Sequence, residues 1–347
     1  MESSFRGQDG IELNLREALV TAASHLGMLD SYALLRRKMS RPQVATLMYH
    51  HVCPREGEHP NFVSPEKFRA QMEYFSREWQ VLSLDELAEY VLLGKSIPER
   101  AVAITLEDGY QDNYRYAYPI LKEYRIPATV FLTTGYVGSR DIFWWNRIDY
   151  AIQHTSRSNL HLGKLGAYSV RSEAEKTLAA SVITENLRKL PEAKRELLVE
   201  KVIDICEAEA RSDLNNNHFL SWEECKEMKN NSIDIGSHTV SHPMLTRLPP
   251  KQARYEMEQS KKHIEEKLGM EVKAFSYPFG DYDTDMVALV RKSGYAYAVT
   301  ATPRKAIGSE DNVYQIGRVA PRYALWALGR FNDTRSIRDL RLVGIGK

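Results

Sequence analysis

An apolar run at residues 101–104 leads into two adjacent carboxylates, and this feature constrains the fold more than any other in the chain. The run is short and uninterrupted, which is typical of a strand buried on both faces. Glu107 and Asp108 follow it, and Gly109 then permits a tight turn. Adjacent residues of a strand point to opposite sides, but a turn at its end can bring both carboxylates into one cavity. Two anions so close need a cation or a shared proton to relieve their repulsion.

Two later apolar runs also end in polar or aromatic residues. Residues 233–236 precede His238, and His242 follows four positions later. A histidine pair at this spacing can converge on one metal if the chain turns helically after the first histidine. Residues 272–275 lead into the Tyr-Pro-Phe-Gly segment at 277–280. One carboxylate with two histidines is a known zinc ligand set that leaves room for a water.

These stretches, in this order, resemble the motifs of NodB-type polysaccharide deacetylases, carbohydrate esterase family four. The more specific resemblance is to the biofilm poly-N-acetylglucosamine deacetylase branch. The family's Thr-Phe-Asp-Asp-Gly motif is matched by residues 105–109, and its His-Ser/Thr-x-x-His motif by residues 238–242. The Pro-x-Gly of its third motif falls on residues 278–280. A Tyr-His-x-Val strand near the start of that branch is matched by residues 49–52.

The resemblance implies a role for each candidate site residue. Asp108, His238 and His242 would bind a divalent metal, most often zinc, which lowers the pKa of water and makes it a nucleophile near neutral pH. The water would attack the carbonyl of an N-acetyl group on a sugar. Glu107 would be the general base, and the backbone N–H of Tyr110 would help to hold the oxyanion. The residues expected to bind substrate are Tyr277, Pro278 and Phe279.

The chain departs from the family pattern in three ways. Glu107 stands where the family has Asp, and its extra methylene moves the carboxylate by ~1.5 Å unless the backbone or rotamer compensates. Misplacements of about 1 Å can cost ~100-fold in rate. Ser276 stands where much of the family has an Arg that orients the base. The chain has no histidine after His263, whereas the wider family takes its general acid from a late motif. We expect His50 to be the general acid, and the alternative is a core histidine bonded to a neighbouring carboxylate.

Strand-like and helical segments alternate along most of the chain, which argues for parallel strands. The C-terminal ends of parallel strands in a barrel converge on one mouth, where active sites are built. We expect an α/β fold: a distorted (β/α)7 barrel of the polysaccharide deacetylase type over residues 44–347. Residues from about 139 to 220 break the alternation and predict a largely helical insertion that covers an edge or the mouth of the site.

Residues 1–43 form a predicted N-terminal helical segment. Apolar residues of the stretch 14–37 fall roughly on one side of a helix, and a basic end follows it. A helix packed on the domain is the favoured interpretation. The alternative is an interfacial helix that contacts anionic lipid through residues 14–41, which would suit an enzyme acting on a lipid-linked glycan.

Composition narrows the class of protein. A net charge of +1 over 347 residues gives no electrostatic argument for nucleic acid as a partner. Three cysteines are an odd number without paired spacing, which favours a reducing compartment. No stretch approaches the ~20 apolar residues of a membrane span, and the first residues do not resemble a signal peptide. We expect a cytoplasmic protein. If the N-terminal helix binds lipid, the protein would also contact the inner face of the membrane peripherally.

The predicted function is metal-dependent hydrolytic N-deacetylation of an N-acetylated sugar in a polysaccharide or glycan precursor. The alternative is a deacetylase-like barrel that binds a glycan but turns it over slowly or not at all. A zinc peptidase is disfavoured, because the chain has no His-Glu-x-x-His motif. An exopolysaccharide, a lipid-linked precursor and a nucleotide-linked sugar all remain open as substrates.

Overall fold

The computed structural model describes residues 44–54, 61–98, 100–207, 218–301 and 312–321, so the predictions for residues 1–43 lie outside it. Its centre is a ring of parallel strands. In spatial order they are β1 (Val44–Tyr49), β5 (Ala101–Leu106), β6 (Ala128–Leu132), β9 (Ile233–Ser237), β10 (Ala274–Ser276), β11 (Tyr297–Thr300) and β12 (Ile316–Gly317). A further strand, β4 (Gln80–Leu82), pairs with the beginning of β5.

Backbone hydrogen bonds just after β12 close the ring. The N–H of Val319 donates to the carbonyl of Thr46 over 2.8 Å, and the N–H of Met48 donates to the carbonyl of Val319 over 3.0 Å. These bonds join the segment just after β12 to β1. The predicted distorted (β/α)7 barrel is confirmed, and its strands all direct their C-terminal ends toward one mouth.

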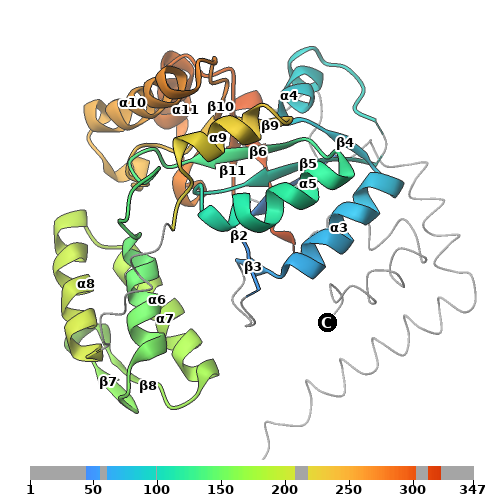
Figure 1. The fold of residues 1–347 in the computed structure, drawn as a ribbon. Helices are drawn as coiled ribbons and strands as arrows, with labels where there is room; N and C mark the ends of the chain where they lie inside the picture. The colour runs from blue at the N-terminus through green and yellow to red at the C-terminus, as the bar shows by residue number, and fades with distance from the viewer. Residues whose placement is uncertain (1–43, 55–60, 99, 208–217, 302–311, 322–347) are drawn as a thin grey trace, which may run out of the picture.

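Helices surround the strands and bury their apolar faces against them (Figure 1). They are α3 (Pro65–Glu78), α4 (Leu84–Leu92), α5 (Tyr118–Tyr124), α9 (Trp222–Lys229), α10 (Pro250–Leu268) and α11 (Thr284–Lys292). Local sequence fixes their ends: Ser83 and Glu86 form a capping box at the start of α4, and Gly269 ends α10 in the left-handed conformation. No helix in the described part of the chain is both long and apolar enough to span a membrane.

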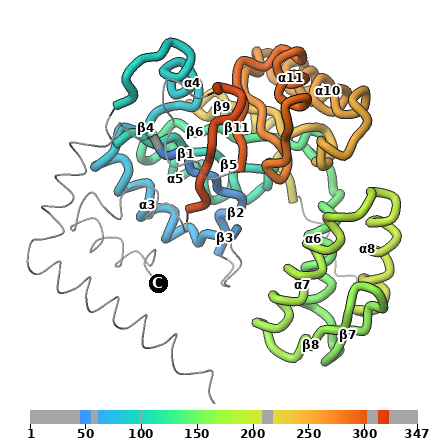
Figure 2. Tube along the Cα trace, turned by 180° about the vertical axis from the view of Figure 1, so that it is seen from behind, coloured from blue at the N-terminus to red at the C-terminus, as the bar shows by residue number. Residues whose placement is uncertain are grey.

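The connection from β6 to β9 carries an insertion that forms a lobe beside the barrel (Figures 1 and 2). It contains α6 (Trp144–His154), the hairpin β7 (Asn159–His161) and β8 (Ala167–Ser169), α7 (Glu173–Arg188) and α8 (Glu192–Cys206). The three helices enclose an apolar core of their own, which includes Ile148, Ile183 and Val202. The lobe is therefore held together largely by its own side chains.

Short elements complete the rim of the barrel mouth. Strands β2 (His51–Val52) and β3 (Phe62–Val63) pair beside it, and the π-helix η1 (Asn113–Ala117) leads into α5. Single 3-10 turns are found at Leu245–Arg247, Pro278–Gly280 and Val313–Gln315, and a further one, Gly163–Leu165, lies between β7 and β8 in the insertion.

Candidate metal and catalytic site

The turn after β5 brings Glu107 and Asp108 into one cavity, as the sequence predicts. Asp108 has a φ of 70° and Gly109 a φ of 76°, both in the left-handed region. A Cβ atom on Gly109 would lie 2.8 Å from the side chain of Leu132, so a glycine is needed here for space as well as conformation. The cavity has a volume of about 760 Å³, and both carboxylates are buried in its lining.

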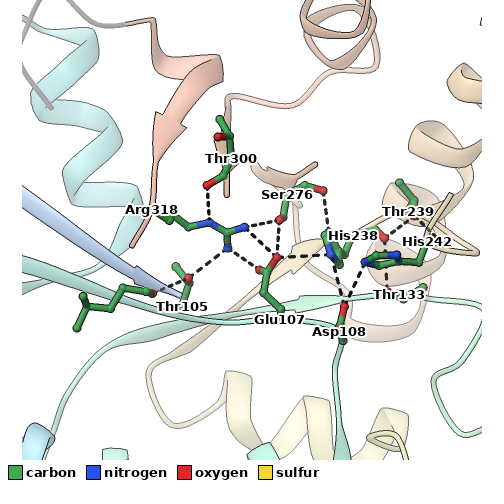
Figure 3. A network of polar contacts seen from close by, with 11 residues as sticks. Thr105, Glu107, Asp108, Thr133, His238, Thr239, His242, Ser276, Thr300 and Arg318 are labelled. Carbon is green, nitrogen blue, oxygen red and sulfur yellow. Dashed lines mark hydrogen bonds and ion pairs between the residues drawn. The ribbon is translucent and has the colours of Figure 1, made fainter. Parts of the chain in front are cut away.

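Asp108, His238 and His242 form a compact group of potential metal ligands. Their ligand atoms all lie within 4.8 Å of one another, and all three residues are buried. The Oδ1 atom of Asp108 is 3.5 Å from Nε2 of His238 and 3.4 Å from Nε2 of His242 (Figure 3). The three residues that the second and first motifs supply are thus brought together at the C-terminal ends of β5 and β9.

The segment between the two histidines is not the helical turn that we named as a condition for their convergence on a metal. Thr239 and His242 have φ values of 69° and 59°, so the chain reverses through left-handed residues instead. The buried Glu256 of α10 holds this turn: its carboxylate accepts hydrogen bonds from the N–H groups of Val240, at 2.8 Å, and Ser241, at 2.9 Å. A carboxylate from a distant helix therefore holds this turn, and the two histidines converge without a helical turn between them.

The protonation states of the three residues suit a divalent cation. Burial lowers the pKa of His238 and lowers that of His242 further, so both imidazoles are neutral. The Nδ1 atom of His238 lies 2.8 Å from the carbonyl of Ser276; donation to that carbonyl leaves the lone pair on Nε2. Burial and the neighbouring Glu107 raise the pKa of Asp108 well above its usual value. A cation would relieve this repulsion, and the nitrogen and oxygen donors are those that zinc prefers.

Glu107 is held by an arginine that the sequence did not indicate. Arg318, just after β12, is 1% exposed and donates from Nη1 to Oε1 of Glu107 over 2.5 Å and from Nη2 to Oε2 over 2.8 Å (Figure 3). The hydroxyl of Ser276 also donates to Oε2, over 2.8 Å. Burial disfavours the charged form of Glu107, but Arg318 and His238 outweigh it, so its pKa lies far below the usual value. Glu107 is therefore ionised.

Each of the five N–H bonds of the Arg318 guanidinium has an acceptor. Besides the two bonds to Glu107, it donates to the carbonyl of Thr300, the hydroxyl of Thr105 and the hydroxyl of Ser276, at 3.1, 3.2 and 2.9 Å. Ser276 occupies the position where much of the family has an arginine, and here an arginine arrives from a different strand. The one signal in the sequence is a lone charge in the apolar run Ile-Gly-Arg-Val-Ala at 316–320.

Tyr110 lies at the join between the barrel and the insertion. Two backbone hydrogen bonds form a bridge here: the N–H of Gln111 donates to the carbonyl of His218, and the N–H of Leu220 donates to the carbonyl of Gly109. The N–H of Tyr110 takes no part in this bridge. The Tyr110 ring is stacked on Phe219.

His50 and His51 both line the cavity. Burial lowers the pKa of His50 to about 3, so its imidazole is neutral. From the sequence we expect His51 to face the opposite side of the strand from His50, but it lines the same cavity. Its Nδ1 atom lies 2.6 Å from Oδ2 of Asp112, and its ring is stacked on Phe62. The neighbouring carboxylate of Asp112 thus pairs with His51, whereas the alternative that we considered was a carboxylate bonded to His50.

The Tyr-Pro-Phe-Gly segment of the third motif contributes three residues to the cavity lining. Tyr277, Phe279 and Gly280 line it, whereas Pro278 is buried and lies outside the lining. The Tyr277 hydroxyl donates to the carbonyl of Tyr314 over 3.2 Å. Phe279, at a φ of 58°, presents its ring to His242 at 4.5 Å between centroids. The motif therefore supports the ligand histidine as well as the cavity wall.

Comparison with known proteins agrees with this geometry. The family model for polysaccharide deacetylases matches residues 94–298. The Bacillus subtilis protein YxkH, which carries the name of a polysaccharide deacetylase, is 25% identical over 284 residues, covering 81% of this chain and 73% of its own. The poly-beta-1,6-N-acetyl-D-glucosamine N-deacetylase of Staphylococcus aureus is 24% identical over 259 residues, covering 74% of this chain and 67% of its own.

Two solved structures share the fold. The Streptococcus pyogenes deacetylase PplD, in complex with acetate, aligns with a TM-score of 0.56 at 18% identity, over 89% of this chain and all of its own. IcaB from Ammonifex degensii aligns with a TM-score of 0.55 at 20% identity, over 83% and 98%. The family model covers more than half of the chain and includes the Glu-Asp, His-His and Pro-x-Gly segments. The chain therefore belongs to the polysaccharide deacetylase family, hydrolases that remove acetyl groups from polysaccharides.

Proposed function

We propose that the protein is a metal-dependent N-deacetylase acting on an N-acetylated sugar of a polysaccharide. The observation that carries the proposal is the presence, in one cavity, of an Asp-His-His ligand group and the buried, ionised carboxylate of Glu107. The Staphylococcus aureus relative, named for deacetylation of poly-β-1,6-N-acetylglucosamine, supports an N-acetylglucosamine polymer as the substrate class.

Asp108, His238 and His242 would hold the metal. A divalent ion there, most suitably zinc, would polarise the acetyl carbonyl and lower the pKa of water. Glu107 takes the proton from the attacking water. Its Oε2 atom lies 3.5 Å from Nε2 of His238, so this oxygen faces the ligand group and is the one to which we assign the proton.

The other residues act on the carbonyl oxygen and the leaving amine. The N–H of Tyr110, which is outside the neighbouring backbone bridge, would donate to the developing oxyanion. His50 is the proposed proton donor to the amine. Because its imidazole is neutral at rest, the proton that it gives to the amine would be the one that Glu107 takes from the attacking water.

Substitution of Glu107 tests this function. Glu107→Gln keeps the size of the side chain and removes its ability to accept a proton. Release of amine from β-1,6-linked N-acetylglucosamine oligosaccharides, with zinc added, should fall by about 10²–10⁴-fold while the metal content stays at one per chain. His238→Ala is the matched variant, which should lose the metal itself. Full activity in Glu107→Gln would refute the base assignment. A wild-type protein that binds the oligosaccharide without turnover would instead be the glycan-binding barrel considered above.

We also propose peripheral membrane contact through residues 14–41, supported by the apolar face and basic end of that segment. A cytoplasmic location at the inner membrane face stays a prediction of the same kind. Deleting the first 40 residues should abolish sedimentation with anionic liposomes and leave deacetylation in solution intact. If the full chain ignores such liposomes at low salt, the proposal is wrong.

A further inference from the structure

The insertion supplies one wall of the active-site cavity. The lining residues on α6 and α7 are Trp145, Asn146, Asp149, Tyr150, Ala180, Ser181, Thr184, Glu185 and Arg188. On each helix these positions recur at spacings of three to four residues or are immediate neighbours, so each set lies on one helical face. Two helices of the lobe therefore turn a largely polar face toward the cavity that contains the catalytic carboxylate.

This wall is fixed to the reaction centre by the first turn of α6. The Trp145 ring lies 4.8 Å from the ring of His242 and 5.7 Å from that of Phe279. The side-chain amide of Asn146 donates to the hydroxyl of Tyr110 over 3.1 Å. One helical turn thus contacts a residue of the second motif, a residue of the third motif and Tyr110, which directly follows the first. Helix α6 continues from that point along the cavity.

Tyr150 is the wall residue that most clearly points to a ligand. Its ring is stacked on His154 at 4.1 Å between centroids. Its hydroxyl is buried and has no hydrogen-bond partner among the residues that the structure describes. Buried hydroxyls normally have a partner, so a ligand group that fills this role would be favoured here. Thr184, on the facing helix, adds a second hydroxyl to the same cavity.

The charged groups of the wall are already paired. Glu185 accepts two hydrogen bonds from Arg188, each 2.9 Å long, and Asp149 accepts one from Gln153 over 3.4 Å. Arg115, the other arginine of the lining, is exposed on the barrel side. A diphosphate-linked sugar is best held by unpaired cations, whereas hydroxyl, amide and aromatic groups suit a neutral sugar chain.

The size of the cavity agrees with more than one sugar unit. Its volume of about 760 Å³ lies in the upper half of the range for small-molecule sites, roughly 300–1,000 Å³. We propose that the α6–α7 wall binds the sugar units next to the one being deacetylated. The substrate is then a neutral oligosaccharide or polysaccharide, not a nucleotide-linked or lipid-diphosphate-linked monosaccharide. This inference rests on the proposed deacetylase function and adds a requirement for chain length, with Tyr150 donating to a sugar hydroxyl.

A chain-length series tests the wall. The full-length protein with zinc is assayed on N-acetylglucosamine, its β-1,6-linked hexasaccharide and UDP-N-acetylglucosamine. The hexasaccharide should have the highest kcat/KM, and its ratio to the monosaccharide should be on the order of 10–100. Tyr150→Phe should lower that ratio by about 5–10-fold, the effect of one hydrogen bond. Thr184→Trp, which fills space between the two helices, should lower it by at least as much.

The control is Leu178→Ser, on α7 but 66% exposed and outside the lining, which should keep the wild-type ratio. Equal kcat/KM values for the two N-acetylglucosamine lengths, a preference for UDP-N-acetylglucosamine, or wild-type ratios in both wall variants would overturn the inference. If none of the compounds is turned over, the proposed function fails first. Calorimetric titration with the hexasaccharide then tests separately whether the α6–α7 wall binds sugar, because Tyr150→Phe must still bind the hexasaccharide more weakly than the wild type.

Discussion

Arg318 is the residue on which the proposed base depends most directly. Glu107 and Arg318 are 3% and 1% exposed, and such a buried pair is favourable only if both partners are fully hydrogen-bonded. Every guanidinium N–H has an acceptor, and both oxygens of Glu107 accept from it. The longer carboxylate of Glu107 reaches the guanidinium of Arg318, which lies just after β12, and the small Ser276 forms hydrogen bonds with both of these residues. We therefore interpret Glu107 as a working general base that Arg318 and Ser276 position, and not as a sign that the protein has lost its activity.

Arg318→Lys tests this interpretation, because lysine keeps the charge but loses the two-pronged contact. We expect kcat/KM to fall by about 10–100-fold, as for other small misplacements of a catalytic group. The pKa of Glu107 is held low partly by Arg318, so weakening the pair should raise it. Activity needs ionised Glu107 and is lost as pH falls through that pKa. The acid limb of the pH profile should therefore move to higher pH.

The matched control is Arg69→Lys, in the exposed ion pair with Glu123, for which no change in activity is expected. A pH profile of Arg318→Lys with an unmoved acid limb, together with wild-type kcat/KM, would show that Arg318 does not act on the base.

At the scale of elements, the strand ends could be predicted from sequence, and the contacts between distant elements could not. Apolar runs ending in Glu-Asp and in His-Thr-Val-Ser-His carry local information, because parallel strands must meet at one mouth. The form of the turn after His238 could not be predicted, because Glu256, on another helix, holds it. Arg318 was missed for a similar reason: its partners Glu107 and Ser276 are over 200 and about 40 positions away, and no periodic pattern links them.

Strand β9 carries a carboxylate whose burial should make stability depend on pH. Asp234 lies between the buried Ile233 and Ile235, and burial, followed by the charge of Asp85, raises its pKa from 3.8 to about 6. The folded protein therefore binds the proton more tightly than the unfolded chain. This contribution to stability is complete below the unfolded pKa and is lost as pH rises from 3.8 through about 6.

Asp234→Asn should raise the free energy of unfolding at pH 7 by about 1 kcal/mol, a value reduced from the full shift because the side chain is partly exposed. The gain should disappear below pH ~4, where the wild-type carboxyl is protonated as well. Chemical denaturation at both pH values measures it. Asp204→Asn, at an exposed position of α8, provides the comparison and should change neither value. A loss of stability at pH 7 would contradict the expectation.

In the whole molecule, the candidate metal site lies where the barrel and the insertion meet. Phe143 and Phe219 pack with Tyr110 across this junction, and Arg247 donates to the backbone carbonyl of Arg188 over 3.0 Å. Trp145 adds its contact with His242. An aromatic ring of the lobe thus contacts a ligand residue directly. Binding or loss of a metal at the ligand group should therefore change the stability of the lobe as well as that of the barrel.

Removal of the metal should therefore lower the stability of the whole protein. Asp108, Thr239 and His242 have positive φ values, and each such residue stores about 1–3 kcal/mol that surrounding contacts must offset. Without a cation, Asp108 also keeps its repulsion with Glu107. A ligand present at 100 times its Kd stabilises the folded state by about 2.7 kcal/mol, so treatment with a chelator should lower Tm by roughly 5 °C.

Differential scanning calorimetry measures this change in Tm, and added zinc should restore the original value. In His242→Ala, which lacks a ligand, the chelator should have no effect. If chelation strips the metal from the wild type and leaves Tm unchanged, the ion does not stabilise these turns.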